Sequence, residues 1–219
     1  MSPALSPPAP DTRVMQLTNA LMALDRVSAA TVITKAVSTD GYLTIADDLI
    51  TPALDAIGEA WDRGEASLAQ VYVAARVCEE MMKAVAPVSA PRVAQPRIGL
   101  AVLEDHHELG KRIISGTLHA TGRTPIDYGA GITAADLAAR AVDDNLDILL
   151  VSTLMLRAAL QVEHLVKALR AGGSHTLVAV GGAPFRFDST LWREVGADAM
   201  GRTASDALAL VVNFAGGRS

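Results

Sequence analysis

The sequence has a single cysteine, few aromatic residues and no long hydrophobic run. Because Cys78 is the only cysteine among 219 residues, the chain forms neither an internal disulfide nor a zinc site built from several cysteines. Cys78 lies in an apolar helical stretch, where we expect a buried, unreactive thiol. The longest apolar runs, at 148–156 and 208–212, are much shorter than the roughly 20 residues that span a bilayer.

Positive charge is also scarce, with 19 Lys and Arg against 24 Asp and Glu and no basic cluster along the chain. The lack of a basic stripe argues against a nucleic-acid partner. The first ten residues have neither the basic nor the apolar region of a secretory signal peptide. Half of the residues are hydrophobic, which excludes a disordered chain. We therefore expect a soluble cytoplasmic protein with no membrane partner.

Four amphipathic helices with short connections are predicted between residues 11 and 86, after a disordered tail at 1–10 that is rich in proline, serine and alanine. Such helices form an antiparallel four-helix bundle. The first segment contains Val14 to Leu24, and the second begins at Ser28, as its N-cap, and ends near Gly41. The third contains Ile45 to Arg63, with an interruption at Pro52, and the fourth runs from Ser67 to Ala86.

A proline-rich linker at 87–96 separates this helical domain from a different pattern at 97–219. There, short apolar runs alternate with helical segments, which is typical of βαβ units and a parallel sheet that is buried on both faces. The fold class is therefore α + α/β, with a doubly wound, Rossmann- or flavodoxin-like second domain. The predicted strands are 97–103, 124–128, 147–152, 175–180 and 197–200, and the predicted helices are 111–121, 134–144, 157–171, 189–195 and a last helix from 203.

Ligands bind beyond the carboxyl ends of the strands in such sheets, so we expect functional residues in the segments that follow them. These segments are 104–110, 129–133, 152–156 and 181–185.

The first of these segments contains the pattern Asp105-x-His107-x-x-Gly110. A histidine at a strand end can bind a metal through one ring nitrogen, while a carboxylate two residues earlier accepts the proton of the other. Gly110 leaves room for a bulky group. A solvated polar turn with a helix N-cap is the alternative interpretation of the same residues.

The remaining histidines are too few to complete a zinc site. His119 and His164 fall within predicted helices, and His175 lies at the entry end of its strand, so we expect surface or half-buried side chains. A metal site with a single histidine implies a metal that a macrocycle already holds.

Two further patterns follow the third and fourth strands, Ser152-x-Leu154 and Gly181-Gly182. Together with the first motif, they resemble the cobalamin-binding domain of methionine synthase, corrinoid methyltransferases and carbon-skeleton mutases. The resemblance implies that His107 is the lower axial ligand of cobalt, replacing the dimethylbenzimidazole of the cofactor. The implied cofactor-binding residues are Asp105 as the hydrogen-bond partner of His107, His106 and Gly110 in the same loop, Ser152 and Leu154 against the buried benzimidazole, and Gly181 and Gly182, which clear space for the nucleotide tail.

The helical domain contains a segment with Gly58, Trp61, Gly64 and Glu65 that resembles the helical cap of methyl-carrying corrinoid proteins. The resemblance implies that this bundle caps the upper face of cobalamin and that Trp61 contributes to its roof. A tryptophan on an amphipathic helix is also typical of a hydrophobic core.

The sequence departs from related patterns at two places. Ala158 stands where methionine synthase has a second serine that completes a proton relay, so the relay ends at Asp105. Val71 and Tyr72 stand where the light-sensing branch of the family has a Glu-His pair, which argues against a photoreceptor of that type.

The resemblance implies a corrinoid protein that carries a methyl group between two methyltransferases, with methylcobalamin and cob(I)alamin as its cofactor forms rather than adenosylcobalamin. The cofactor supplies the chemistry and partner proteins supply donor and acceptor, so no catalytic residue is assigned to the chain. A reductive activator is a further partner that the resemblance allows. The alternative is a cobalamin-dependent sensor or antirepressor that acts through a partner regulator. A mutase small subunit is disfavoured because it needs no helical cap. The sequence does not determine the oligomeric state.

Overall fold

The computed structural model describes residues 12–86 and 96–216. The chain divides into two compact units between Val85 and Ala86, a helical unit and an α/β unit. The predicted linker at 87–96 and the predicted tail at 1–10 lie outside the described residues, apart from Pro96.

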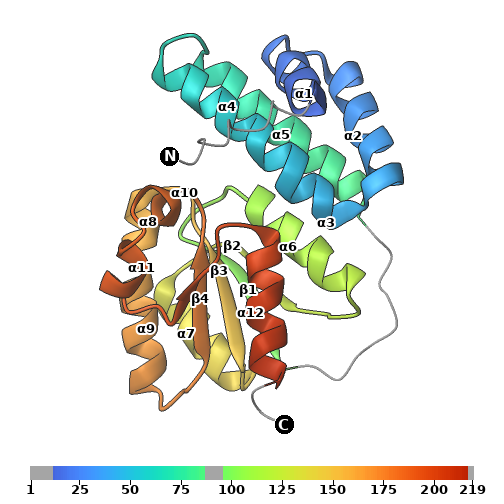
Figure 1. Ribbon diagram of the computed structural model, residues 1–219. Helices are drawn as coiled ribbons and strands as arrows, with labels where there is room; N and C mark the ends of the chain where they lie inside the picture. Colours follow the sequence, from blue (N-terminus) through green and yellow to red (C-terminus); the bar gives the residue numbers. More distant parts are fainter. Residues whose placement is uncertain (1–11, 87–95, 217–219) are drawn as a thin grey trace, which may run out of the picture. The chain divides into compact units, whose positions relative to one another are not determined.

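The helical unit confirms the predicted bundle of amphipathic helices (Figure 1). Its core comes from one face of each helix, as with Leu17 and Leu21 of the first helix and Ile57 of the fourth. Cys78 is buried, and burial raises the pKa of its thiol to about 12. The elements are α1 (Thr12–Met22), α2 (Arg26–Asp40), α3 (Tyr42–Ile45), the π-helical turn η1 (Ala46–Ile50), α4 (Thr51–Asp62) and α5 (Leu68–Ala84).

Two expectations about helix ends are wrong. Asp25, not Ser28, caps α2, because the Asp25 carboxylate accepts both the backbone N–H and the hydroxyl of Ser28, at 3.0 and 2.6 Å. Pro52 does not interrupt the third segment. It lies in the first turn of α4, directly after the π-helical turn, and the Thr51 hydroxyl donates to the Ala46 carbonyl at 2.8 Å.

The α/β unit is a five-stranded sheet in the order β2-β1-β3-β4-β5, with every neighbouring pair parallel. This order confirms the predicted doubly wound fold and places the switch in strand order between β1 and β3. The elements are β1 (Ile98–Leu103), α6 (Leu109–Ala120), β2 (Ile126–Ile132), α7 (Ala134–Asp143), β3 (Ile148–Ser152), α8 (Leu156–Leu160), α9 (Val162–Ala171), β4 (Leu177–Gly181), α10 (Ala183–Phe187), α11 (Leu191–Glu194), β5 (Ala199–Met200) and α12 (Ala204–Gly216).

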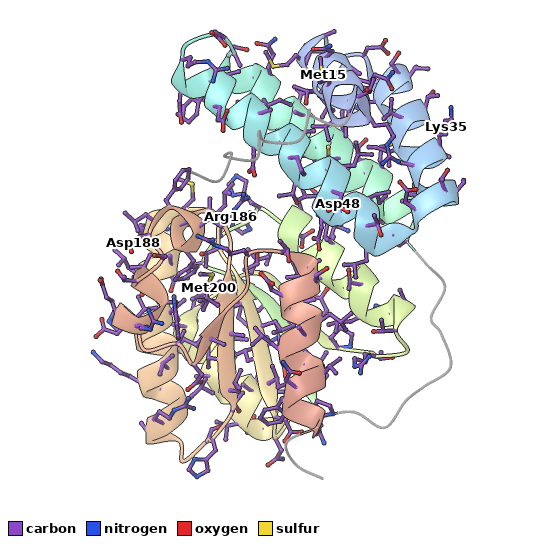
Figure 2. All side chains as sticks on the ribbon, in the orientation of Figure 1. Met15, Lys35, Asp48, Arg186, Asp188 and Met200 are labelled. Atoms are coloured by element: carbon purple, nitrogen blue, oxygen red, sulfur yellow. The ribbon has the colours of Figure 1, made fainter. Side chains whose placement is uncertain are left out.

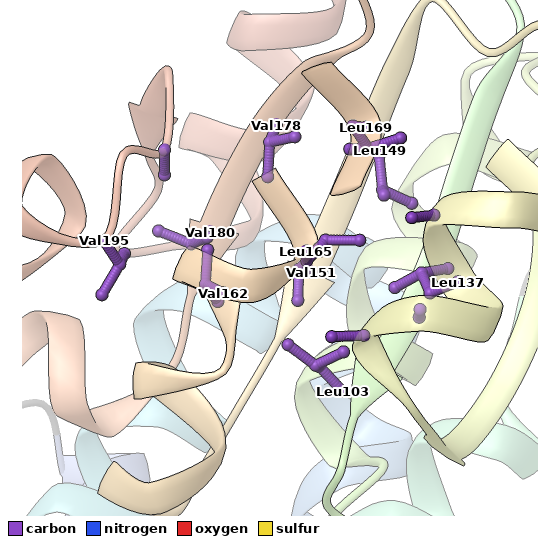
Figure 3. Close-up of a cluster of buried hydrophobic side chains, with 14 of the residues drawn as sticks. Leu103, Leu137, Leu149, Val151, Val162, Leu165, Leu169, Val178, Val180 and Val195 are labelled. Atoms are coloured by element: carbon purple, nitrogen blue, oxygen red, sulfur yellow. The ribbon is translucent and has the colours of Figure 1, made fainter. Parts of the chain in front are cut away.

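Helices cover both faces of this sheet, with α6 and α12 on one face and α7 and α9 on the other (Figure 1). Alternate residues of β3 belong to opposite faces. Leu149 and Val151 join the core on the α7/α9 face, which Figure 3 shows, whereas Ile148 and Leu150 join the core on the α6/α12 face. This explains why the central strands are apolar at every position.

The largest difference from prediction is at β2, which continues to Ile132 instead of ending at Tyr128. Between its pairings with Leu100 and Leu103 of β1, the strand advances from Asp127 to Ile132 and therefore carries two extra residues. Gly129 and Gly131 have positive φ angles of 81° and 74°, as bulged strands often require. Most of the predicted loop at 129–133 is therefore strand.

Two smaller differences concern helices. The predicted helix at 157–171 is divided at Gln161 into α8 and α9, and a short helix, α10, occupies most of the predicted loop at 181–185. Among the described residues, no helix is long and apolar enough to cross a membrane.

Candidate functional site

The candidate site lies at the carboxyl edge of the sheet, beside the switch between β1 and β3. Val102 of β1 pairs with Ser152 of β3, which pairs with Gly181 of β4. The second and third motifs therefore begin at the same level on adjacent strands, and the first begins at Asp105, two residues after the end of β1. Figure 2 labels Arg186 on α10 and Met200 at the end of β5, which mark the same edge.

Asp105 joins the first motif to the second. One carboxylate oxygen accepts the backbone N–H groups of His106 and His107, at 2.6 and 3.1 Å. The other accepts those of Leu154 and Met155, at 2.8 and 3.0 Å. Asp105 is only 4% exposed. Burial by itself raises the pKa of this carboxyl, but the hydrogen bonds from the His107 side chain and from these amides outweigh it and lower the pKa to about 2.

The same carboxylate sets the tautomer of His107. Nδ1 of His107 contacts Asp105 Oδ1, and because an ionised carboxylate only accepts hydrogen bonds, Nδ1 carries the proton. In the neutral imidazole the free lone pair is then on Nε2, and the His107 side chain is 46% exposed. The arrangement provides one oriented, accessible imidazole ligand.

His106 lies against a different part of the protein. Gly131 of β2 is so close that a β-carbon there would lie 2.3 Å from Cε1 of the His106 ring. The loop backbone is held to the same strand, since Gly131 N–H donates to Asp105 O at 2.7 Å and Glu104 N–H donates to Ile132 O at 3.0 Å. Of the two adjacent histidines, only His107 is oriented by the carboxylate of Asp105.

Positions without side chains surround Ser152 on the α6/α12 face. A β-carbon at Gly110 would lie 3.1 Å from Ser152 Oγ, and one at Gly181 would lie 3.1 Å from the carbonyl oxygen of Gly201. Sequence reasoning missed Gly201, although it directly follows the last strand, as Gly182 directly follows β4. Side chains at Gly110 and Gly181 would therefore crowd these neighbours, and glycine leaves the surroundings of the Ser152 hydroxyl free of further side chains.

The structure gives Gly182 a different explanation from the predicted one. Its φ is 116°, and a β-carbon there would lie 1.7 Å from the carbonyl oxygen of Thr153. Gly182 is therefore required by contact between two backbone segments, before any ligand is considered. Thr153 is 1% exposed, and its hydroxyl has no hydrogen-bond partner among the described residues. Sequence reasoning did not single out this unsatisfied group, which lies between Ser152 and Leu154.

Leu154 is 44% exposed, and Met155 and Leu156 beside it are exposed as well. An apolar rim of this kind suits a large ligand with an apolar body.

Trp61, the predicted site residue of the helical unit, lies near the end of α4 and is 49% exposed. Ile57 and Ala60 form the buried face of this helix, so the interpretation of Trp61 as a core residue is wrong. Leu68 and Tyr72 of α5 are other exposed apolar residues of this unit.

The residues of the α/β unit fit a metal that is already held by a macrocycle. Within 12–86 and 96–216, no group of three His, Cys, Asp or Glu side chains could hold a metal ion. What the site offers is one histidine nitrogen, glycines in place of side chains around Ser152 and an apolar rim. This combination fits cobalamin, because the corrin ring already supplies four of the cobalt ligands and a single protein nitrogen is enough to add another.

Comparison with known proteins agrees with this chemistry. Two family models, each described as a B12 binding domain, match residues 97–212 and 14–86. A corrinoid protein of Desulfitobacterium hafniense (strain Y51) is 29% identical over 180 residues, which are 76% of this chain and 80% of that protein. The trimethylamine corrinoid protein of Methanosarcina barkeri is 27% identical over 169 residues, which are 74% of this chain and 76% of that protein.

The solved structure of the Methanosarcina barkeri monomethylamine corrinoid protein has a TM-score of 0.78 to this chain at 19% identity, and covers 94% of this chain and 99% of that one. At this identity the likeness concerns the fold. Since one family model alone spans more than half of the residues, the chain belongs to the B12-binding-domain family, as a corrinoid protein with a helical B12-binding domain ahead of an α/β one.

Proposed function

We propose that this corrinoid protein carries a methyl group on cobalamin between two methyltransferase partners. The observation that carries the proposal is the His107–Asp105 pair, in which the carboxylate engages Nδ1 of His107 and leaves Nε2, on a side chain that is 46% exposed, available at the carboxyl edge of the sheet. The names of the relatives support a role in the metabolism of methylated amines. Cobalamin supplies a cobalt centre that accepts and releases a methyl group.

The residues of the chain would hold and tune this cofactor. His107 would ligate cobalt, and Asp105 would hold its ring in one tautomer and orientation. The glycine-lined region around Ser152, Gly110 and Gly181 would adjoin the nucleotide tail. The low pKa of Asp105 keeps it ionised at neutral pH, so its carboxylate can accept the Nδ1 proton of His107.

Ala158 makes the control of His107 simpler than in methionine synthase. It is buried in α8 and contributes only a methyl group where that family member has a hydroxyl. The Asp105 carboxylate accepts four backbone N–H groups and contacts the His107 ring. We therefore expect the Asp105–His107 pair to act without a serine relay at this position.

Electron paramagnetic resonance of the Co(II) protein tests the ligand. We expect nitrogen superhyperfine splitting that changes from a triplet to a doublet when the histidines carry nitrogen-15, because the ligating nitrogen then belongs to the protein. His107→Ala should abolish this splitting while cobalamin is retained, and His106→Ala should preserve it. A triplet that nitrogen-15 leaves unchanged would mean that the base of the cofactor is still bound to cobalt.

A methyl-transfer assay tests the role. The reduced, cobalamin-loaded protein should take up a labelled methyl group when it is incubated with a methyltransferase encoded beside it and the methyl donor of that enzyme. His107→Ala serves as the control in which cobalt lacks its proposed protein ligand. If no such enzyme methylates the protein, and cofactor binding or light instead changes its association with a regulatory protein, the sensor replaces the carrier.

A further inference from the structure

Lys111 is a buried cation close to the site that neither the motifs nor the proposed function explains. It lies in the first turn of α6 and is 4% exposed. Its ammonium donates to both carboxylate oxygens of Asp127 on β2, at 2.8 and 3.1 Å, and lies 3.3 Å from Glu108. A buried lysine is rare unless it is paired, and here two carboxylates compensate its charge.

The Lys111–Asp127 ion pair is the second of two attachments that hold residues 104–111, the His107 segment, to strand β2. The segment begins at Glu104 and Asp105, whose backbone bonds to Ile132 and Gly131 fasten it to the end of β2. It ends at Lys111, whose side chain fastens the first turn of α6 to Asp127 of the same strand. His107 lies between these two attachments.

The two extra residues of β2 lie between these two attachment points along the strand. Asp127 and Ile132 are five residues apart on β2 but face Leu100 and Leu103, only three residues apart on β1. The strand therefore bends between the point that holds α6 and the point that holds the loop.

We propose that Lys111 and Asp127 are positioning residues, whose ion pair fixes the start of α6 on β2 and so sets where His107 lies relative to the cobalt of a bound cobalamin. The inference rests on the proposed role of His107 as a ligand of that cobalt. Both residues act through the segment that carries His107, so they are positioning rather than catalytic residues.

Packing of α6 on the sheet does not depend on this pair. Farther along the helix, Ile114 and Leu118 join the apolar core on the α6/α12 face. Asp127 has a side chain that is 51% exposed, so it stays solvated if its partner is removed. Loss of the pair should therefore loosen the first turn and the preceding loop, and leave the fold in place.

The neighbouring Arg112 provides a matched control. Its guanidinium pairs with Glu108, the same carboxylate that Lys111 approaches. Lys111→Met and Arg112→Met each remove one cation beside Glu108. Only the first removes the bond to Asp127, and Asp127→Asn weakens that bond from its other end.

Amide hydrogen exchange of the cofactor-free protein is the first measurement. For the amides of residues 106–109, we expect exchange about tenfold faster in Lys111→Met and faster in Asp127→Asn, because local opening becomes easier. Exchange of the β3 amides should be unchanged. Arg112→Met should resemble the wild-type protein. If both test variants match Arg112→Met, the pair does not position the loop and the inference is wrong.

Paramagnetic resonance of the cobalamin-loaded Co(II) protein is the second measurement. The fraction of cobalt with a protein nitrogen should fall in Lys111→Met and Asp127→Asn, through a ligation constant about fivefold lower, or ~1 kcal/mol. Arg112→Met should keep the wild-type fraction. Unchanged ligation in both test variants, beside a normal wild-type spectrum, would overturn the positioning role alone. A wild-type spectrum without protein nitrogen would instead overturn the proposed ligand, and with it this inference.

Discussion

At the scale of single residues, Asp105 is the group on which the geometry of the site depends most. Its two oxygens accept four backbone N–H groups, and one of them also contacts the His107 ring. The sequence predicted the Asp105–His107 contact from their spacing. It did not predict the bonds to Leu154 and Met155, because they join residues about fifty positions apart that meet only when β1 and β3 pair.

Asp105→Asn tests the charge of this residue. The amide group of asparagine replaces one acceptor oxygen by a donor, so we expect the free energy of unfolding at pH 7 to fall by about 1–3 kcal/mol. Because the folded pKa of Asp105 is about 2, below its ordinary value of 3.8, its ionisation stabilises the fold above that ordinary value. This contribution is lost as the pH falls toward about 2.

The measurement is urea unfolding of both proteins between neutral pH and the acid limit of the folded state. The difference between wild type and variant should shrink as the pH falls below the ordinary pKa. Asp136→Asn, at an exposed carboxylate in the first turn of α7, is the control, with an expected change below about 1 kcal/mol. A difference that stays constant with pH would show that the charge of Asp105 does not stabilise the loop.

At the scale of elements, local patterns predicted the helices and central strands well, and failed where tertiary contacts decide. The central strands were predictable because they carry apolar residues at every position, a pattern that few other elements of the chain share. β2 was predicted too short because its Gly129 and Gly131 are typical of a loop, and its strand character comes from pairing with β1. Ser28 and Asp25 are both good caps by type, and only the backbone geometry selects Asp25.

Two glycines give a prediction about elements. Gly182→Ala should destabilise the protein by more than about 2 kcal/mol or prevent folding, because the new methyl group meets the Thr153 carbonyl at a positive φ. Gly58→Ala should stabilise it by about 0.5–1 kcal/mol, since Gly58 lies inside α4 with nothing within 4 Å of the new β-carbon.

Thermal unfolding of the two variants measures both effects under the same conditions. Equal midpoints for Gly182→Ala and the wild-type protein would mean that the turn after β4 can move away from Thr153 at little cost.

At the scale of the whole molecule, the chain consists of two units with separate cores. Every predicted cofactor-binding residue except Trp61 lies in the α/β unit, and no single stretch of sequence contains them all. The sequence allowed this assignment because each motif follows its own strand. It could not show the bend in β2 or the burial of Lys111, which depend on how distant segments pack.

The division predicts that the α/β unit binds cobalamin without the helical unit. A chain of residues 96–219 should fold, because its sheet is covered on both faces by its own helices. It should bind cobalamin with the cofactor's benzimidazole off cobalt, as judged by absorption and paramagnetic resonance, whereas residues 12–86 alone should bind none. Binding by the helical fragment alone would contradict the assignment of the site to the α/β unit.

The two outer strands of the sheet have a consequence for self-association. The outward backbone groups of a straight edge strand can pair with a strand of a neighbouring molecule, which leads to aggregation. At one edge β5 is only two residues long, and at the other β2 is bent at two left-handed glycines and carries the charged Asp127. Neither edge offers the regular row of donors and acceptors that an added strand requires. The bend that holds the His107 segment therefore also protects the sheet against edge-to-edge growth at high protein concentration.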